Sequence, residues 1–102
     1  MIELSVMYPQ QEGKRFNLDY YLKDHAALIQ AKWGGLVKEA SFVRGLSGGS
    51  ADAPPTYQVV AHIRFRSMDD FKQALATGGE LFADIPNFTD IKPTVQVSEV
   101  IG

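Results

Sequence analysis

The chain has 102 residues, a formal net charge of −2 and no cysteine. Since domains usually contain about 100–150 residues, we expect residues 1–102 to form one domain. The lack of cysteine excludes disulfides, thiolate metal sites and a cysteine nucleophile. Ten Lys and Arg against twelve Asp and Glu, with no basic run, argue against a nucleic-acid partner. No stretch approaches the roughly 18 apolar residues of a membrane span and no leader pattern is present, so we expect no membrane association and a cytoplasmic location.

The first third of the chain predicts a strand followed by a helix. Residues 2–8 alternate between apolar and polar side chains, which is typical of a strand with one buried face, and the strand should end at Pro9. Asn17 then offers a helix N-cap, and apolar side chains recur every three or four residues until Gly34 and Gly35 end the pattern. This stripe consists of Leu18, Tyr21, Leu22, His25, Ile29 and Trp33. We expect the helix to bury it.

The rest of the chain predicts two strands, a second helix and a last strand. Residues 37–46 are typical of an edge strand that leads into a loop rich in Gly, Ser and Pro. Residues 57–66 alternate most clearly, with one wholly apolar face and one mixed face. Ser67 is the expected N-cap of the second helix, and residues 91–101 contain the last strand. The apolar stripe of that helix is Met68, Phe71, Ala74 and Leu75.

This order of elements predicts an α+β, ferredoxin-like βαββαβ fold, in which both helices cover one face of a four-stranded antiparallel sheet. The first and third strands are central in that topology, so their apolar faces should lie under the helices. Their other faces stay uncovered and present Ser5, Met7, Val60, His62 and Arg64. A mixture of this kind is unusual for ordinary surface, so we expect another molecule to cover it. The pattern leaves open which side of the sheet is occupied by Phe42, Arg44, Gln96 and Ser98.

Three segments carry a resemblance to a known family. They are Tyr20–His25 (YYLKDH), Gly45–Gly49 (GLSGG) and Asp84–Ile91 (DIPNFTDI), of which the last is the most specific. On these segments the whole chain resembles the EthD family, which belongs to the dimeric α+β barrel group. The resemblance implies a homodimer whose two sheets pair face to face, and this pairing would cover the open face.

The resemblance implies less about the reaction than about the fold. The family is named for a component of a bacterial ethyl tert-butyl ether degradation system that works beside a cytochrome P450 monooxygenase. Relatives with the same fold include muconolactone-type isomerases, cofactor-independent monooxygenases, cyclases and haem-degrading enzymes. The fold alone does not choose among these reactions.

The two histidines are the candidate proton-transfer groups, because imidazole changes charge near neutral pH. His62 lies mid-strand on the uncovered face beside Arg64, whose guanidinium could bind a carboxylate or enolate oxygen. His25 matches the histidine of the family's Tyr-Tyr-x-x-x-His motif. As alternatives, His25 is a packing residue, and His62 with Arg64 pairs with carboxylates across a dimer interface. The expected catalytic set is His62, His25 and Arg64.

We expect neither a metal nor an organic cofactor. Two histidines 37 positions apart, without closely spaced ligands, give a metal site little support, and nothing specific supports haem. The segment Gly45–Gly49 leads into a proline-rich loop rather than into a helix N-terminus, so it lacks the context of a phosphate-binding loop.

The leading hypothesis is an enzyme that uses acid–base chemistry on a small hydrophobic metabolite such as an aromatic compound, a lactone or an ether-degradation intermediate. Its reaction would be that of an isomerase, dehydratase, cyclase or cofactor-free monooxygenase. The expected substrate-binding residues are Tyr21, Ser5, Met7, Val60, Phe88 and Asn87. Burial is the alternative role for Tyr21, and turn formation is the alternative role for Asn87. The competing hypotheses are a non-catalytic binding protein that serves an oxygenase or degradation pathway, and a structural dimer that fills its own cavity.

Overall fold

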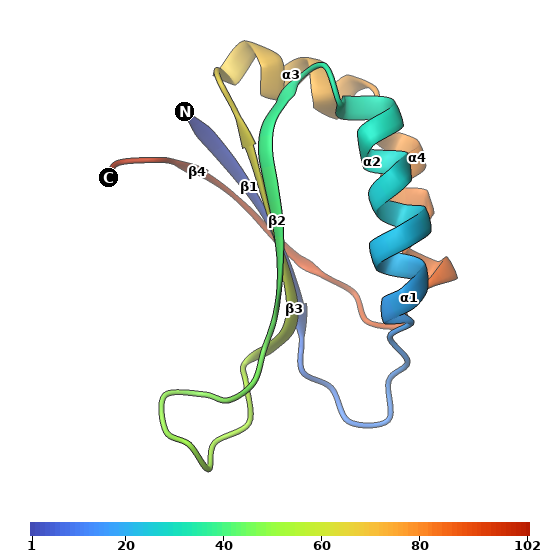
Figure 1. The fold of residues 1–102 in the computed structure, drawn as a ribbon, viewed down its shortest axis with the longest axis vertical. Coiled ribbons are helices and arrows are strands. Elements are labelled where there is room, and N and C mark those ends of the chain that lie inside the picture. The colour runs from blue at the N-terminus through green and yellow to red at the C-terminus, as the bar shows by residue number, and fades with distance from the viewer.

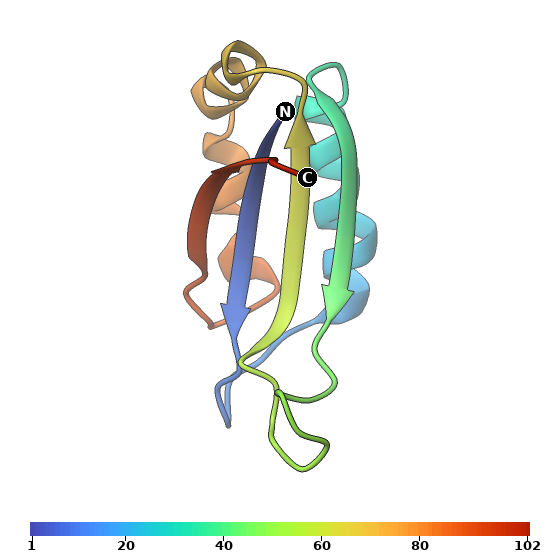
Figure 2. The same ribbon diagram turned by 90° about the vertical axis from the view of Figure 1, so that its left-hand side faces the viewer.

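Helices cover one face of a four-stranded antiparallel sheet and leave the other face open in the computed structural model of residues 1–102 (Figure 1, Figure 2). The strands are β1 (Ile2–Pro9), β2 (Val37–Arg44), β3 (Tyr57–Phe65) and β4 (Thr94–Glu99), in the spatial order β2-β3-β1-β4. The helical elements are α1 (Leu18–Tyr20), the π-helical turn η1 (Tyr21–His25), α2 (Ala26–Trp33), α3 (Met68–Ala76), α4 (Gly79–Ala83) and the 3₁₀ turn η2 (Ile85–Asn87). The central positions of β1 and β3 confirm the predicted ferredoxin-like topology. No helix has the length and apolar character needed to cross a bilayer.

Strand register decides which side chains share a face, because directly opposed residues point to the same side of a sheet. Val6 lies opposite Ala61 on the helix-covered side, whereas Ser5 lies opposite His62 on the open side. The outer strands follow the same register, which the sequence pattern had left open. Phe42 and Arg44 share the side of Ala61 and Val59 and therefore face the helices, while Gln96 and Ser98 share the side of Ser5 and Glu3.

The core lies between the two layers and is built mainly from the strictly apolar faces of β1 and β3. Trp33, at the end of α2, is one of its largest members and packs edge-on against Phe65, with ring centroids 5.7 Å apart. The indole Nε1–H of Trp33 donates a hydrogen bond of 2.9 Å to the carbonyl of Ala74 near the end of α3. One side chain therefore joins both helical segments to the sheet.

Both predicted helix caps are present. The side chain of Asn17 accepts a hydrogen bond of 3.1 Å from the backbone N–H of Tyr20, and Ser67 Oγ accepts one of 3.2 Å from Asp70. These bonds satisfy N–H groups that have no partner within the helix.

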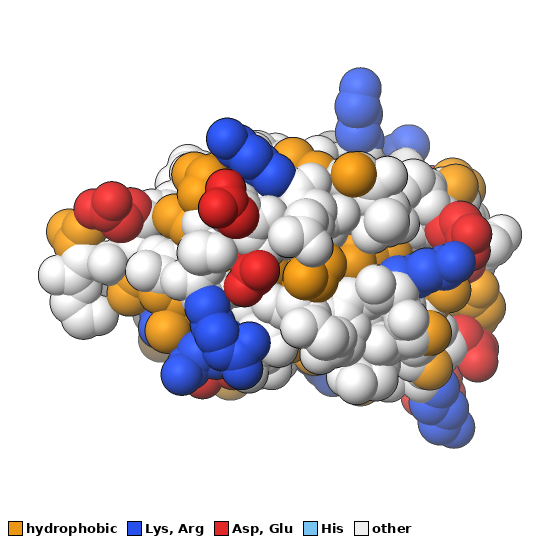
Figure 3. Space-filling view, turned by 90° about the horizontal axis from the view of Figure 1, so that it is seen from above, with side chains coloured by type: hydrophobic (Ala, Val, Ile, Leu, Met, Phe, Trp, Pro, Cys, Tyr) orange, Lys and Arg blue, Asp and Glu red, His pale blue; other side chains and the backbone are white.

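Two apolar stripes are narrower than predicted. Leu22 is 50% exposed, and Met68 and Leu75 on α3 are also exposed. Successive helical residues are turned by about 100°, so only the centre of each stripe reaches the sheet. The end-on view of Figure 3 shows exposed apolar side chains scattered among acidic and basic ones.

The outer strands are shorter than predicted. The last strand begins at Thr94 because Pro93 lacks the N–H needed for the ladder, and Ile91 is buried in the preceding loop. The edge strand β2 ends at Arg44, where Gly45 begins the loop.

The hydrogen bond of Trp33 generates a stability test. Trp33→Phe removes the indole donor and leaves unfilled volume between α2 and α3, so we expect a loss of about 1–3 kcal/mol in the free energy of unfolding. Urea unfolding followed by circular dichroism measures this. Leu22→Ala, at an exposed site, should change stability by about 0.5 kcal/mol or less. Equal effects of the two substitutions would contradict the role given to Trp33.

Candidate functional site

The side chains with chemical potential form two groups on opposite sides of the sheet. His25 lies in the layer between the sheet and the helices, whereas His62 and Arg64 project from the open face. The expected catalytic set is therefore divided between two sites, which have different surroundings.

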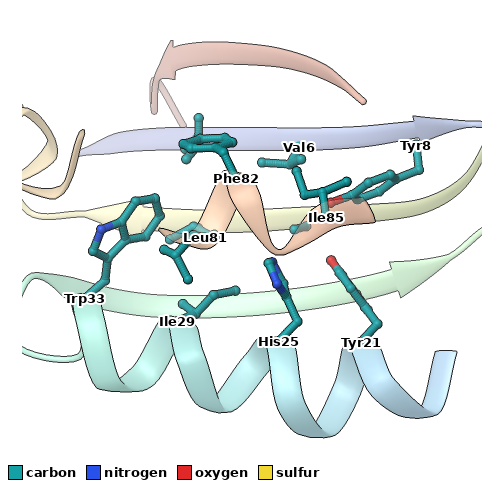
Figure 4. Close-up of a pocket in the computed structure, with 12 residues that line it drawn as sticks. Val6, Tyr8, Tyr21, His25, Ile29, Trp33, Leu81, Phe82 and Ile85 are labelled. Carbon is teal, nitrogen blue, oxygen red and sulfur yellow. The ribbon is translucent and has the colours of Figure 1, made fainter. Parts of the chain in front are cut away.

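The inner site is a small cavity of about 30 Å³ enclosed between α2, α4 and the central strands (Figure 4). That volume accommodates one or two water-sized groups. Its walls include Leu4 and Val6 from β1, Ile29 and Trp33 from α2, and Leu81 from α4. Four lining residues have polar side-chain atoms, which are His25, Tyr21, Tyr8 and Trp33, and the indole nitrogen of Trp33 is already bonded to Ala74.

His25 is held by a partly buried carboxylate. Its Nδ1 lies 2.9 Å from Asp84 Oδ2, and the Asp84 side chain is only 11% exposed. An ionised carboxylate can only accept hydrogen bonds, so Nδ1 carries the proton and donates it. Nε2 makes no hydrogen bond within the protein, and in the neutral ring it carries the free lone pair. The pair thus has the arrangement of a general base with an orienting carboxylate.

Asp84 is itself fixed by two further donors. The hydroxyl of Tyr20 and the side-chain amide of Asn87 donate to Oδ1 at 2.7 and 2.9 Å. Burial by itself would raise the pKa of the Asp84 carboxyl, but the hydrogen bonds from Asn87, Tyr20 and His25 outweigh it and hold the pKa below its ordinary value. Asp84 is therefore ionised at neutral pH.

Aromatic packing sets the plane of the imidazole. The His25 ring stacks on Tyr21, with centroids 5.6 Å apart and an interplanar angle of 13°, and Phe88 packs against it at 4.7 Å. Tyr21 and His25 are the two ends of the π-helical turn η1, where the N–H of Ala26 reaches back to the carbonyl of Tyr21. Such turns occur frequently at functional sites.

Hydrogen bonds between residues 15–17 and residues 86–89 hold together the two segments that carry this site. Arg15 donates to the carbonyls of Pro86 and Asn87 at 2.7 and 3.2 Å, and its own carbonyl accepts from Thr89 Oγ1 at 2.6 Å. The N–H of Asn17 donates to the carbonyl of Phe88 at 2.7 Å. The start of the first helix and the Asp84–Ile91 segment are therefore held in register, and this brings His25 to Asp84.

The open-face group centres on Glu3. Its carboxylate accepts from Arg64 Nε at 2.9 Å and from Ser5 Oγ at 3.3 Å, and it lies 3.4 Å from His62 Nδ1. Arg64 Nε is also 3.6 Å from Glu39. The hydrogen bond from Arg64 is the main reason that the pKa of Glu3 is lowered; burial opposes it and His62 adds to it. Carboxylates of the same chain therefore engage Nε of the guanidinium that was expected to bind a substrate oxygen.

The remaining predicted site residues are also divided between the two sides of the sheet. Met7 and Val60 are opposed on the open face next to Ser5 and His62. Phe88 is fully buried against His25, and the exposed Asn87 reaches the site only through Asp84. The predicted site residues did not include Asp84, Glu3, Tyr20 and Tyr8, which belong to these groups. Tyr20 and Asp84 stand at the heads of the YYLKDH and DIPNFTDI segments, which was the available signal.

Comparison with known proteins identifies the class and the family of this chain. No family model and no curated protein matches the sequence, whereas several solved structures do. A dimeric protein of unknown function with a ferredoxin-like fold from Bacteroides fragilis NCTC 9343 matches with a TM-score of 0.53 and 14% identity, over 97% of this chain and 95% of that one. This match defines the class as ferredoxin-like α+β proteins.

Two closer structures define the family. An EthD-like protein from Ralstonia eutropha JMP134 has a TM-score of 0.91 and 35% identity, over 99% of this chain and 92% of that one. An EthD family protein from Bacillus halodurans C-125 has a TM-score of 0.74 and 21% identity, over 99% of each chain. The chain belongs to the EthD-like family, as the three sequence segments indicated.

The lowered pKa of Asp84 generates a pH test. Because its pKa in the folded state lies below the unfolded value of about 3.9, the carboxylate contributes stability that is fully present above that pH and is lost as the pH falls through the folded pKa. We expect Asp84→Asn to lower the free energy of unfolding by about 1–3 kcal/mol at pH 7 and much less near pH 2. Unfolding in urea at a series of pH values measures the gap.

Glu3→Gln provides the comparison, because the pKa of Glu3 is also lowered but Glu3 lies on the open face. A gap between wild type and Asp84→Asn that stays constant from pH 7 to pH 2 would contradict the charge state assigned to Asp84.

Proposed function

We propose that this protein is an acid–base enzyme that acts on a small apolar molecule in the inner cavity, with His25 as the catalytic base. The observation that carries the proposal is the free Nε2 of a buried histidine whose Nδ1 is held by an ionised carboxylate. Such an arrangement is that of a proton-transfer group rather than of a packing histidine, which would use its ring nitrogens on the backbone. The proposal requires no organic cofactor.

In the proposed reaction Nε2 removes a proton from the substrate and the same nitrogen returns it at another atom. Asp84 holds the ring in one tautomer and stabilises the imidazolium that forms, because it is already ionised. Tyr20 and Asn87 keep the carboxylate in place. This sequence of proton transfers suits isomerisation, elimination or cyclisation, which are among the reactions expected from the family resemblance.

The size of the cavity limits the substrate. About 30 Å³ is far below the roughly 300–1,000 Å³ of pockets that hold drug-sized ligands. Phe82 on α4 lines the cavity and is 37% exposed, so it stands between the cavity and solvent. We propose that substrate enters by displacement of α4 around Phe82 and that the substrate is small.

We further propose that the open sheet face pairs with the same face of a second copy. No helix lies over this face, and only the C-terminal end of the chain passes across it (Figure 1, Figure 2). Glu3 and Arg64 already neutralise each other within the chain, which lowers the cost of removing them from water. The dimeric B. fragilis protein with the same fold supports the pairing.

Light scattering tests the dimer. Val60 lies on the open face between Met7 and Val43, so Val60→Glu should place a charge in the interface and convert the protein from twice to once the 11.3 kDa chain mass at micromolar concentration. Leu22→Glu, on the outer side of the first helix, should leave the mass unchanged. A wild-type protein that is monomeric at this concentration would contradict the proposed pairing.

Substrate turnover tests the base. Small aromatic, lactone and carbonyl compounds are incubated with the protein and followed by NMR, with binding followed in parallel by Trp33 fluorescence, since Trp33 lines the cavity. His25→Gln keeps a donor for Asp84 but removes the base, so turnover should fall by about 10²- to 10⁴-fold while binding persists.

His62→Gln separates the two histidines, and it should retain turnover. Loss of turnover in His62→Gln with full activity in His25→Gln would move the chemistry to the open face. Binding without turnover of any compound would instead favour the non-catalytic binding protein.

A further inference from the structure

Two tyrosine hydroxyls face the cavity beside His25 without a partner in the protein. Tyr8 and Tyr21 are each 1% exposed and line the cavity, and no hydrogen bond joins either hydroxyl to the chain. Since no fully buried side-chain oxygen or nitrogen lacks a partner, both hydroxyls keep access to the cavity space. Figure 4 shows the two oxygen atoms pointing toward the same space alongside the imidazole. Tyr20 provides the contrast within one turn of helix, because its hydroxyl is bound to Asp84.

A hydroxyl whose only access is to a small apolar cavity can find a hydrogen-bond partner only in a molecule bound there. Packing does not require the two hydroxyls, since the ring of Tyr8 makes edge-on contacts with Phe16 and Tyr21 that phenylalanine would also make. Burial raises the pKa of both tyrosines, and the neighbouring Tyr8 raises that of Tyr21 further. Both groups are therefore protonated over the whole range in which the protein would work, and they can donate hydrogen bonds.

The charges of the residues that line the cavity limit which ligands the two hydroxyls can bind. No Lys or Arg lines the cavity. A carboxylate or phosphate would enter it without a counter-charge, which is strongly unfavourable in an apolar space. Two neutral donors are better suited to an oxygen that is uncharged on binding and becomes negative during the reaction.

We propose that the hydroxyls of Tyr8 and Tyr21 stabilise an enolate oxygen, and that the substrate class is therefore a small, uncharged, apolar carbonyl compound with a C–H bond next to the carbonyl. This inference rests on the proposed function, because it uses His25 as the base. In the forward step His25 Nε2 takes the proton of that C–H bond, the C–H electron pair becomes the new C=C bond, and the C=O π pair moves to the oxygen. The imidazolium then returns the proton at the oxygen, or, where a further C=C bond of the substrate is conjugated with the enolate, at the far carbon of that bond, so the product is an isomer and no oxidant or reductant is needed.

The test uses 4-nitrophenol, whose ionised and neutral forms have different visible spectra and whose oxygen stands in for the enolate. Titrations at several pH values give the ratio of bound phenolate to bound phenol. Because the cavity is small, they are made in the wild-type protein and in Phe82→Ala, which enlarges the cavity from its solvent side. Tyr8→Phe and Tyr21→Phe should each lower the phenolate-to-phenol ratio about tenfold, since hydrogen bonds to a charged oxygen are stronger than those to a neutral one.

Tyr57→Phe is the matched control, because Tyr57 does not line the cavity, and it should leave the ratio unchanged. Circular dichroism establishes that each variant is folded. Ratios that do not change in Tyr8→Phe and Tyr21→Phe, or no binding of either form in both backgrounds, would overturn the inference.

The outcome of the phenolate titration can be separated from the outcome of the turnover test of the proposed function. Turnover that depends on His25 together with an unchanged phenolate ratio would sustain the base and reject the enolate site. A ratio that depends on the tyrosines without any turnover dependent on His25 would sustain the oxygen site and reject the enzyme.

Discussion

The hydrogen bond between His25 and Asp84 joins two segments that are 59 residues apart, and the arrangement of the inner cavity depends on it. It fixes the imidazole against the sheet, leaves Nε2 free and places an ionised carboxylate in a largely apolar layer. A carboxylate that is largely removed from water in this way stays ionised only when donors surround it. Asp84 has three donors, and the hydrogen bonds between Arg15 and the Pro86–Thr89 segment keep these donors in place.

The polar groups on the two faces of the sheet have different surroundings. On the covered face, apolar packing surrounds a small cavity to which a few polar atoms without a partner in the chain keep access, and such atoms are where a ligand gains most from binding. On the open face, Glu3 accepts a hydrogen bond from Arg64 Nε and lies 3.4 Å from His62 Nδ1, which supports the proposed pairing of this face with a second copy. Alternation along β1 and β3 separates these roles, since neighbouring residues point to opposite sides.

Local patterns were sufficient to predict the fold. The alternation in β1 and β3, the caps at Asn17 and Ser67 and the glycine stops define the elements, and the ferredoxin-like topology is the arrangement that buries both apolar strand faces. Exposure of Leu22 and the late start of β4 depend on how far the partner layer extends, which a single segment does not encode.

The site was harder to predict because its partners are distant in the chain. His25 was identified as a candidate, but Asp84 carries no local sign that it is buried, and Tyr8 has the same pattern as any core residue of a strand. Conversely, the two-residue spacing of His62 and Arg64 correctly placed them on one face, but Glu3 on the neighbouring strand, which engages both of them, was overlooked.

The central claim is that His25 carries its proton on Nδ1 and presents an unprotonated Nε2 to the cavity. Nitrogen-15 NMR of the histidine rings at a pH where His25 is neutral measures the tautomer directly. Here His25 should be almost entirely in the Nδ1–H form in the wild-type protein, and Asp84→Ala, which removes the acceptor, should abolish that preference. A His25 that is protonated on Nε2, or that shows the same tautomer mixture with and without the Asp84 carboxylate, would contradict this account.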